Sequence, residues 1–115
     1  MTGTESQRIL KIRSLLVRDL GEIFNLMGHK FYAGVMFTVT TVRITPDLSI
    51  AKVYLSMFPT NDKEAVLARI TENASTIRYE LGKRIGKQMR IVPELKFFID
   101  DSLDYIEKID DLLNK

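Results

Sequence analysis

Hydrophobic and polar residues follow a helical spacing in the first part of the chain. Between Glu5 and about Met27, apolar residues recur every three or four positions for about six turns. These positions are Ile9, Ile12, Leu16, Leu20 and Ile23. The spacing predicts a helix that ends at Gly28, followed by a loop over residues 28–34, "GHKFYAG", with glycine at both ends.

The pattern then changes to alternation. Residues 35–45, "VMFTVTTVRIT", are rich in β-branched and aromatic side chains, which predicts a strand. Residues 50–58 place Ala, Val, Leu and Met on one face and Lys, Tyr, Ser and Phe on the other, which predicts a second strand. Between them, Pro46 favours a turn and Asp47 can accept a hydrogen bond from its own backbone neighbours. We therefore expect an antiparallel hairpin.

A second helical spacing runs from residue 61 to Ile85. Asn61, with Glu64 three positions later, forms a capping signature at its start. The stretch 73–76, "NAST", is the weak place in this helix, because Asn, Ser and Thr side chains compete for backbone hydrogen bonds. We expect a kink or break there and a helix end at Gly86.

After Pro93 the alternation returns over residues 95–99 and predicts a third strand. Residues 101–115 have a helical stripe and five acidic side chains, which predicts an acidic C-terminal helix. The expected order is helix, strand, strand, kinked helix, strand and helix. That order predicts a single α+β domain over residues 1–115, with helices covering one face of a three-stranded sheet.

Composition limits the class of protein. The chain has no Cys, which excludes disulfides and thiolate chemistry and fits a cytoplasmic location. His29 is the only histidine, and we expect it to be an ordinary loop residue. No apolar run is long enough to span a membrane, so we expect a soluble protein. A monomer is the default expectation, because the sequence does not indicate an oligomeric state.

The sequence contains no common catalytic motif. Gly-rich phosphate loops and the HExxH, CxxC and GxSxG patterns are all missing from it. Asp100, Asp101 and Asp104 would be the candidate ligands for Mg²⁺, but Asp residues at the start of a helix usually cap it. We therefore expect no catalytic residue, no metal and no cofactor.

Charge is divided along the chain. The net charge is +2, but residues 100–115 hold six acids against two lysines and carry −4, so the first 99 residues carry +6. This asymmetry favours a polyanionic partner for the main body of the protein.

The cations that suggest a binding surface fall in two segments. The first set is Arg78, Lys83, Arg84, Lys87 and Arg90, and the second is Arg8, Lys11, Arg13 and Arg18. If the long helix persists, the first set forms one stripe, and the second set shares a face of the first helix. Each run alone is typical of a solvated helix surface, whereas two runs together favour a nucleic-acid surface. The strand residues Lys52, Tyr54, Lys96 and Phe98 form a further candidate surface, but one that is expected to lack the paired aromatic residues of a stacking platform.

Three stretches resemble one family. "VTTVRITPDLSIAKVYLSMF" (39–58), "IRYELGKRI" (77–85) and "MRIVPELKFFIDDSLDYI" (89–106) are similar to ribosome-binding factor A, a bacterial small-subunit assembly factor. The resemblance covers nearly the whole chain. It implies a type II KH-like domain with a kinked helix, and a non-catalytic protein that binds the free small (30S) ribosomal subunit and its 16S rRNA.

The resemblance also implies a role in late 16S rRNA maturation and in growth in the cold. Arg78, Arg84 and Arg90 match family positions, whereas Lys83 and Lys87 rest on charge alone. The family has Ala, any residue and Gly at its kink, but residues 73–76 contain no glycine. Two main hypotheses remain open: an RNA-binding assembly factor that uses both sets of cations, and a protein-interaction module with the same fold. A third, enzymatic hypothesis around Asp100, Asp101 and Asp104 would require binding of a divalent metal.

Overall fold

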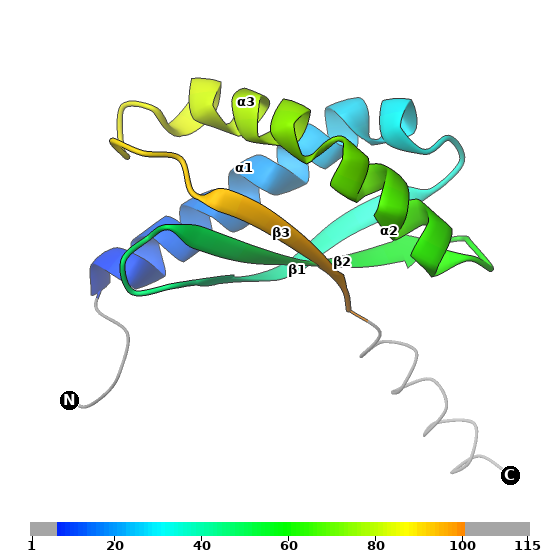
Figure 1. The fold of residues 1–115 in the computed structure, drawn as a ribbon, viewed down its shortest axis with the longest axis horizontal. Coiled ribbons are helices and arrows are strands. Elements are labelled where there is room, and N and C mark those ends of the chain that lie inside the picture. Colours follow the sequence, from blue (N-terminus) through cyan, green and yellow to red (C-terminus); the bar gives the residue numbers. More distant parts are fainter. Residues whose placement is uncertain (1–6, 101–115) are drawn as a thin grey trace, which may run out of the picture.

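The computed structural model describes residues 7–100 of the chain, which form three helices and a three-stranded sheet. The elements follow the order α1, β1, β2, α2, α3 and β3 (Figure 1). All three helices lie on one side of the sheet, and no helix among residues 7–100 covers the other side. The predicted α+β class, the order of the elements over residues 7–100 and the one-sided helical layer are therefore confirmed. The predicted C-terminal helix, with Asp101 and Asp104, lies outside the described residues.

Helix α1 (Gln7–Phe31) is longer than the sequence pattern predicted. Its buried face includes Leu16 and Leu20, as expected, but the helix continues through Gly28 for one further turn. The prediction that Gly28 ends the helix was wrong, and His29 lies in the last helical turn rather than in a loop. Gly34, with φ of 82°, is where the backbone reverses toward the first strand.

Strands β1 (Met36–Ile44) and β2 (Ile50–Phe58) form the predicted antiparallel hairpin, with a register shift between Val39 and Thr41. Asp47 organises the connecting turn. Its Oδ1 accepts hydrogen bonds from the Ser49 backbone N–H at 3.1 Å and from the Ser49 and Thr45 hydroxyls at 2.7 and 2.8 Å. These hydrogen bonds hold the pKa of the Asp47 carboxyl below its usual value. The predicted turn chemistry of Asp47 is confirmed.

The long helical segment is divided in two. Helix α2 (Lys63–Glu72) ends before Asn73, and helix α3 (Ala74–Ile85) begins directly after it. The Asn73 side-chain amide donates to the Arg69 carbonyl at 2.8 Å, and its backbone N–H donates to the Ile70 carbonyl. These hydrogen bonds make the break without a glycine, as the weak stretch at 73–76 predicted.

The ends of the same segment test two further predictions. The cap of α2 is Asp62 rather than Asn61, because the Asp62 carboxylate accepts a hydrogen bond from the Ala65 backbone N–H at 3.0 Å. Helix α3 ends before Gly86, as predicted. The sequence therefore located the segment correctly and misplaced its cap by one residue.

Strand β3 (Glu94–Ile99) pairs in parallel with β2, so the strand order across the sheet is β1-β2-β3. The inward side chains of the strands pack against the helices, with Val53, Leu55 and Phe97 among them. On the helical side, the core includes Leu16 of α1 and Leu81 of α3. None of the described helices is long and apolar enough to cross a membrane.

Candidate nucleic-acid interface

A shallow groove of about 580 Å³ lies between α3 and the segment that leads into β3. We call it the α3 groove. Its lining residues are Ser75, Arg78, Tyr79, Gly82, Lys83, Arg90, Ile91 and Val92. Three of the predicted cations, Arg78, Lys83 and Arg90, therefore come together around one concave surface. Lys83 and Arg90 belong to different segments, so the fold rather than the helix spacing brings them together.

Arg78 holds the two walls of the α3 groove together. Its Nε donates to the Pro93 carbonyl at 3.1 Å, and one terminal nitrogen donates to the Val92 carbonyl at 2.5 Å. The guanidinium thus satisfies two backbone acceptors of the chain that enters β3. Arg78 positions the groove and contributes its positive charge at the same place.

Replacing Arg78 by alanine is expected to lower the free energy of unfolding by about 1–2 kcal/mol, because two backbone carbonyls lose a charged donor. Urea unfolding measures the loss, and amide hydrogen exchange should show faster opening of residues 86–93. The control is Lys87→Ala, which removes an exposed cation from residues 86–93. Equal stability of the two variants would contradict a positioning role for Arg78.

Lys83 and Tyr79 form the outer edge of the groove. The Lys83 ammonium lies 5.2 Å from the centre of the Tyr79 ring and 3.2 Å from a Glu80 carboxylate oxygen. Tyr79 is 67% exposed. An exposed aromatic ring beside a cation suits a stacked base next to a phosphate.

Arg90 also lines a second hollow, of about 220 Å³, with Arg8. The other lining residues come from the β1–β2 turn (47–49) and from the segment beside Arg90 (89 and 91). The start of α1 and the segment before β3 therefore lie together at one end of the molecule (Figure 1). Arg8 extends the positive surface of the α3 groove around this end.

Gly82 is a groove residue whose role the sequence did not reveal. A Cβ at this position would lie 3.3 Å from Val92 Cγ2, so the glycine lets the chain before β3 pack closely on α3. Ile91, 72% exposed, also lines the groove without having been predicted.

The continuous stripe that was expected if the long helix persisted does not form. Helix α3 ends at Ile85, so Lys87 and Arg90 lie beyond it. Lys87 is exposed in the segment after the helix and is not among the residues that line the α3 groove.

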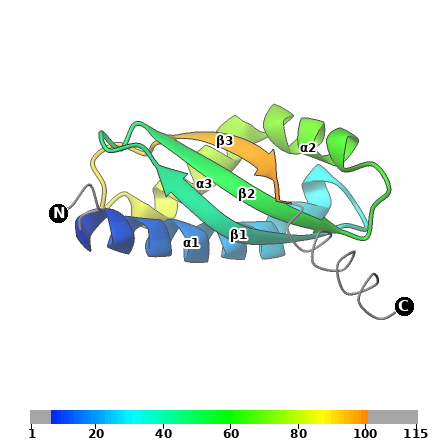
Figure 2. The same cartoon turned by 90° about the horizontal axis from the view of Figure 1, so that it is seen from below.

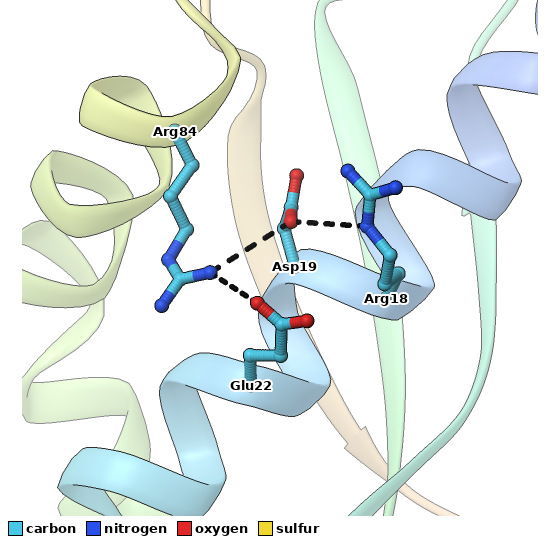
Figure 3. A network of polar contacts seen from close by, with 4 residues as sticks. All are labelled: Arg18, Asp19, Glu22 and Arg84. Carbon is cyan, nitrogen blue, oxygen red and sulfur yellow. Dashed lines mark hydrogen bonds and ion pairs between the residues drawn. The ribbon is translucent and has the colours of Figure 1, made fainter.

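Arg84 points toward α1 (Figure 3) and is not among the residues that line the α3 groove. Its guanidinium forms an ion pair with Glu22 and lies 3.8 Å from Asp19 Oδ1. Arg18 Nε approaches the same oxygen at 3.3 Å. The Asp19 side chain is only 6% exposed, so a buried carboxylate has two arginines as its counter-charges. Arg84 therefore links α3 to α1 through these ion pairs.

The predicted cations of α1 do not all line one hollow. Lys11 and Arg18 line one shallow hollow of about 500 Å³ with Leu10, Ser14 and Leu15. Arg13 is half-buried, and Arg8 belongs to the hollow shared with Arg90. Arg8 therefore lies beside Arg90, whereas Lys11 and Arg18 line a separate hollow.

Within residues 7–100 there is no group of three His, Cys, Asp or Glu side chains placed to hold a metal ion. The features that the described part of the chain does bring together are cations and an exposed tyrosine. These groups recognise phosphate and unstacked bases.

Comparisons with a family model and with curated proteins indicate the same family. The family model described as ribosome-binding factor A matches residues 8–113. Ribosome-binding factor A of Flavobacterium johnsoniae is 46% identical over 112 residues, which cover 95% of this chain and 85% of that protein. The protein of the same name from Cytophaga hutchinsonii is 40% identical over 111 residues, covering 96% of this chain and 84% of that protein.

Solved structures show the same fold. The crystal structure of ribosome-binding factor A from Thermus thermophilus matches with a TM-score of 0.66 at 24% identity, covering 79% of this chain and 94% of that chain. A homology model of the Thermus thermophilus protein, fitted into a cryo-EM map of a 30S–RbfA complex, matches with a TM-score of 0.62 at 24% identity, covering 77% of this chain and 91% of that chain. The sequence matches extend over nearly the whole chain, and the chain therefore belongs to the ribosome-binding factor A family.

Proposed function

We propose that this protein is a non-catalytic assembly factor that binds the free small ribosomal subunit through its 16S rRNA and promotes late maturation of that RNA. The observation that carries the proposal is the α3 groove, where cations from two segments meet beside an exposed tyrosine. Family membership supports the same interpretation, because a Thermus thermophilus relative is described in a complex with the 30S subunit.

Within this proposal, Lys83 and Arg90 contact RNA phosphates directly and Arg8 extends the contact. Arg78 holds the groove in shape while adding charge, and Tyr79 offers a ring for a base. The other predicted cations, Lys87, Lys11, Arg13 and Arg18, give secondary electrostatic support. Arg84 contributes mainly to stability, through its ion pair with α1.

The mechanism follows from the kind of contact. Phosphate contacts fix the position of an RNA segment without reading its sequence, so the protein would hold a flexible part of the 16S rRNA in one conformation. Release would follow when the maturing subunit reshapes or covers that site. Such binding needs no cofactor and acts in the cytoplasm on single subunits, with the protein as a monomer.

The test is cosedimentation of the full chain with purified small subunits at several salt concentrations. Lys83→Ala/Arg90→Ala is expected to bind about tenfold more weakly than the natural chain. The slope of log affinity against log salt should fall in magnitude by roughly 1.4–1.8, since two phosphate contacts are lost.

The matched control is Lys30→Ala/Arg69→Ala, which removes the same charge from the end of α1 and from α2, outside the α3 groove. Its slope should stay near that of the natural chain. Equal losses in both variants would sink the assignment to the groove. Binding to subunit proteins that survives nuclease treatment would favour a protein-interaction module instead.

A further inference from the structure

The face of the sheet that no described helix covers carries a row of three cations. Figure 2 shows this face in front of α2 and α3. Arg43 of β1 lies opposite Lys52 of β2, and Lys52 lies opposite Lys96 of β3. All three side chains are exposed. The register therefore places one positive charge on each strand, side by side across the whole sheet.

An aromatic pair lies in the next row, so the expectation that this surface lacks paired aromatic residues was wrong: parallel pairing of β2 with β3 brings two distant residues together. Tyr54 of β2 is opposite Phe98 of β3, and their rings stack with centroids 5.3 Å apart and an interplanar angle of 23°. The Arg43 guanidinium carbon lies 6.0 Å from the centre of the Tyr54 ring. Phe98 is 37% exposed. We call these five residues, Arg43, Lys52, Tyr54, Lys96 and Phe98, the sheet face.

The row of cations works against stability. Like charges directly opposite one another on neighbouring strands destabilise a sheet. Each of the three paired positions in the row holds a cation, so the register sets no carboxylate directly across from Lys52 on either side. The acid of β3, Glu94, lies opposite Ile50 in a different row. The arrangement is therefore better explained by an anionic ligand than by folding.

We propose that the sheet face is a second RNA-binding surface, which takes a single-stranded segment. Its phosphates lie along Arg43, Lys52 and Lys96, and one or two unstacked bases lie on Tyr54 and Phe98. A polyanion with regularly spaced charges complements a row with one cation on each strand, and exposed rings accept the faces of bases that are not paired. Duplex RNA would offer the charges without the free bases.

This surface is distinct from the α3 groove, which lies in the helical layer on the other side of the sheet. An RNA segment at the groove and a second segment on the sheet face would therefore hold the protein from two sides. The sheet face can be tested with free RNA, so its test does not depend on the proposed role in the small subunit.

The experiment measures fluorescence anisotropy of a labelled, uracil-rich single-stranded RNA of about eight nucleotides with the full chain. Two double variants address the two rows: Lys52→Gln/Lys96→Gln, and Tyr54→Val/Phe98→Val, which keeps residues that favour strands. Each is expected to weaken binding about fivefold to tenfold. Lys30→Gln/Arg69→Gln, with the same charge change as the first variant, should bind like the natural chain.

An abasic version of the RNA separates stacking from charge. The aromatic double variant should bind the abasic RNA as tightly as the natural chain does, whereas the lysine double variant should still bind it more weakly. Repeating both titrations in the Lys83→Ala/Arg90→Ala background reduces the contribution of the α3 groove. Photo-crosslinking of 4-thiouridine RNA to the unaltered chain should label peptides that contain Tyr54 and Phe98, which removes dependence on how the variants fold.

Several results would overturn the proposal. One is loss of affinity that is equal in the sheet-face variants and the control. Another is that the sheet-face variants keep their affinity for the oligonucleotide but no longer bind small subunits, which would indicate a protein partner on this face. A third is RNA binding that occurs only after the acids of residues 101–115 are changed to amides, which would identify that segment as the occupant. None of these outcomes bears on the Lys83→Ala/Arg90→Ala test of the α3 groove.

Discussion

Arg84→Ala is expected to lower the free energy of unfolding by about 2–3 kcal/mol, a large effect for one residue of a cationic run. The reason is Asp19, whose side chain is 6% exposed and which would lose one of its two arginine partners. Removing one partner of a buried ion pair leaves the other charge without its partner. The loss lowers the free energy of unfolding by about 3–5 kcal/mol when both side chains are fully buried. The Arg84 side chain is 30% exposed, so solvent screening reduces the expected loss.

A second substitution tests the cause. Asp19→Asn placed in the Arg84→Ala background removes the uncompensated charge, so it should restore part of the lost stability. A double-mutant cycle by urea unfolding then gives the coupling between the two residues. The Asp19 Oδ2 atom is buried without a hydrogen-bond partner among the described residues, which makes this carboxylate especially dependent on the contacts of its other oxygen.

The control is an arginine in an exposed ion pair. Arg69 lies 3.8 Å from Glu72, and both side chains are more than half exposed. Its replacement by alanine should change stability by no more than about 0.5 kcal/mol. If Arg84→Ala and Arg69→Ala cost the same, the network in Figure 3 does not stabilise the fold.

Binding assays show whether Arg84 also contributes to RNA binding, apart from its effect on stability. At a temperature where the variant is fully folded, Arg84→Ala should weaken binding to small subunits less than Lys83→Ala/Arg90→Ala does. A variant with natural stability and strongly weakened binding would return Arg84 to the RNA surface, as its place in the cationic run first suggested.

The sequence predicted the elements well because their signals are local. The alternation over residues 50–58 matches β2, and the competition of Asn73 for backbone hydrogen bonds marks the break between α2 and α3. Asp47 acts within its own turn. In each case the residues that decide the structure are neighbours in the chain.

The grouping of the candidate site depends on contacts between distant segments, which periodicity does not encode. Arg84 and Glu22 are 62 residues apart in the chain, so a run of cations gave no sign that one of them faces a carboxylate. Arg90 joined the groove because the chain turns back after Ile85, not because the helix continues. The cationic row on the sheet likewise depends on β3 pairing in parallel with β2.

Gly28→Ala is expected to destabilise the protein by about 2–3 kcal/mol, although alanine is the better helix former. Gly28 lies inside α1, and a Cβ there would come within 2.8 Å of Phe37 Cδ2 and 3.2 Å of Cε2. The Phe37 ring is buried and packs against Phe24, with centroids 5.3 Å apart, so it has little room to move. Overpacking of this kind costs about 1–3 kcal/mol, and the shortest contact places this site at the upper end.

Gly21 provides a matched control in the same helix, because a Cβ at Gly21 would meet nothing within 4 Å. Gly21→Ala should stabilise the protein by about 0.5–1 kcal/mol, through the lower conformational entropy of the unfolded chain and the higher helix propensity of alanine. Thermal and urea unfolding of the two variants should therefore shift in opposite directions. Stabilisation in both would show that Phe37 moves aside without loss, and that Gly28 is not needed for the packing of α1 on β1.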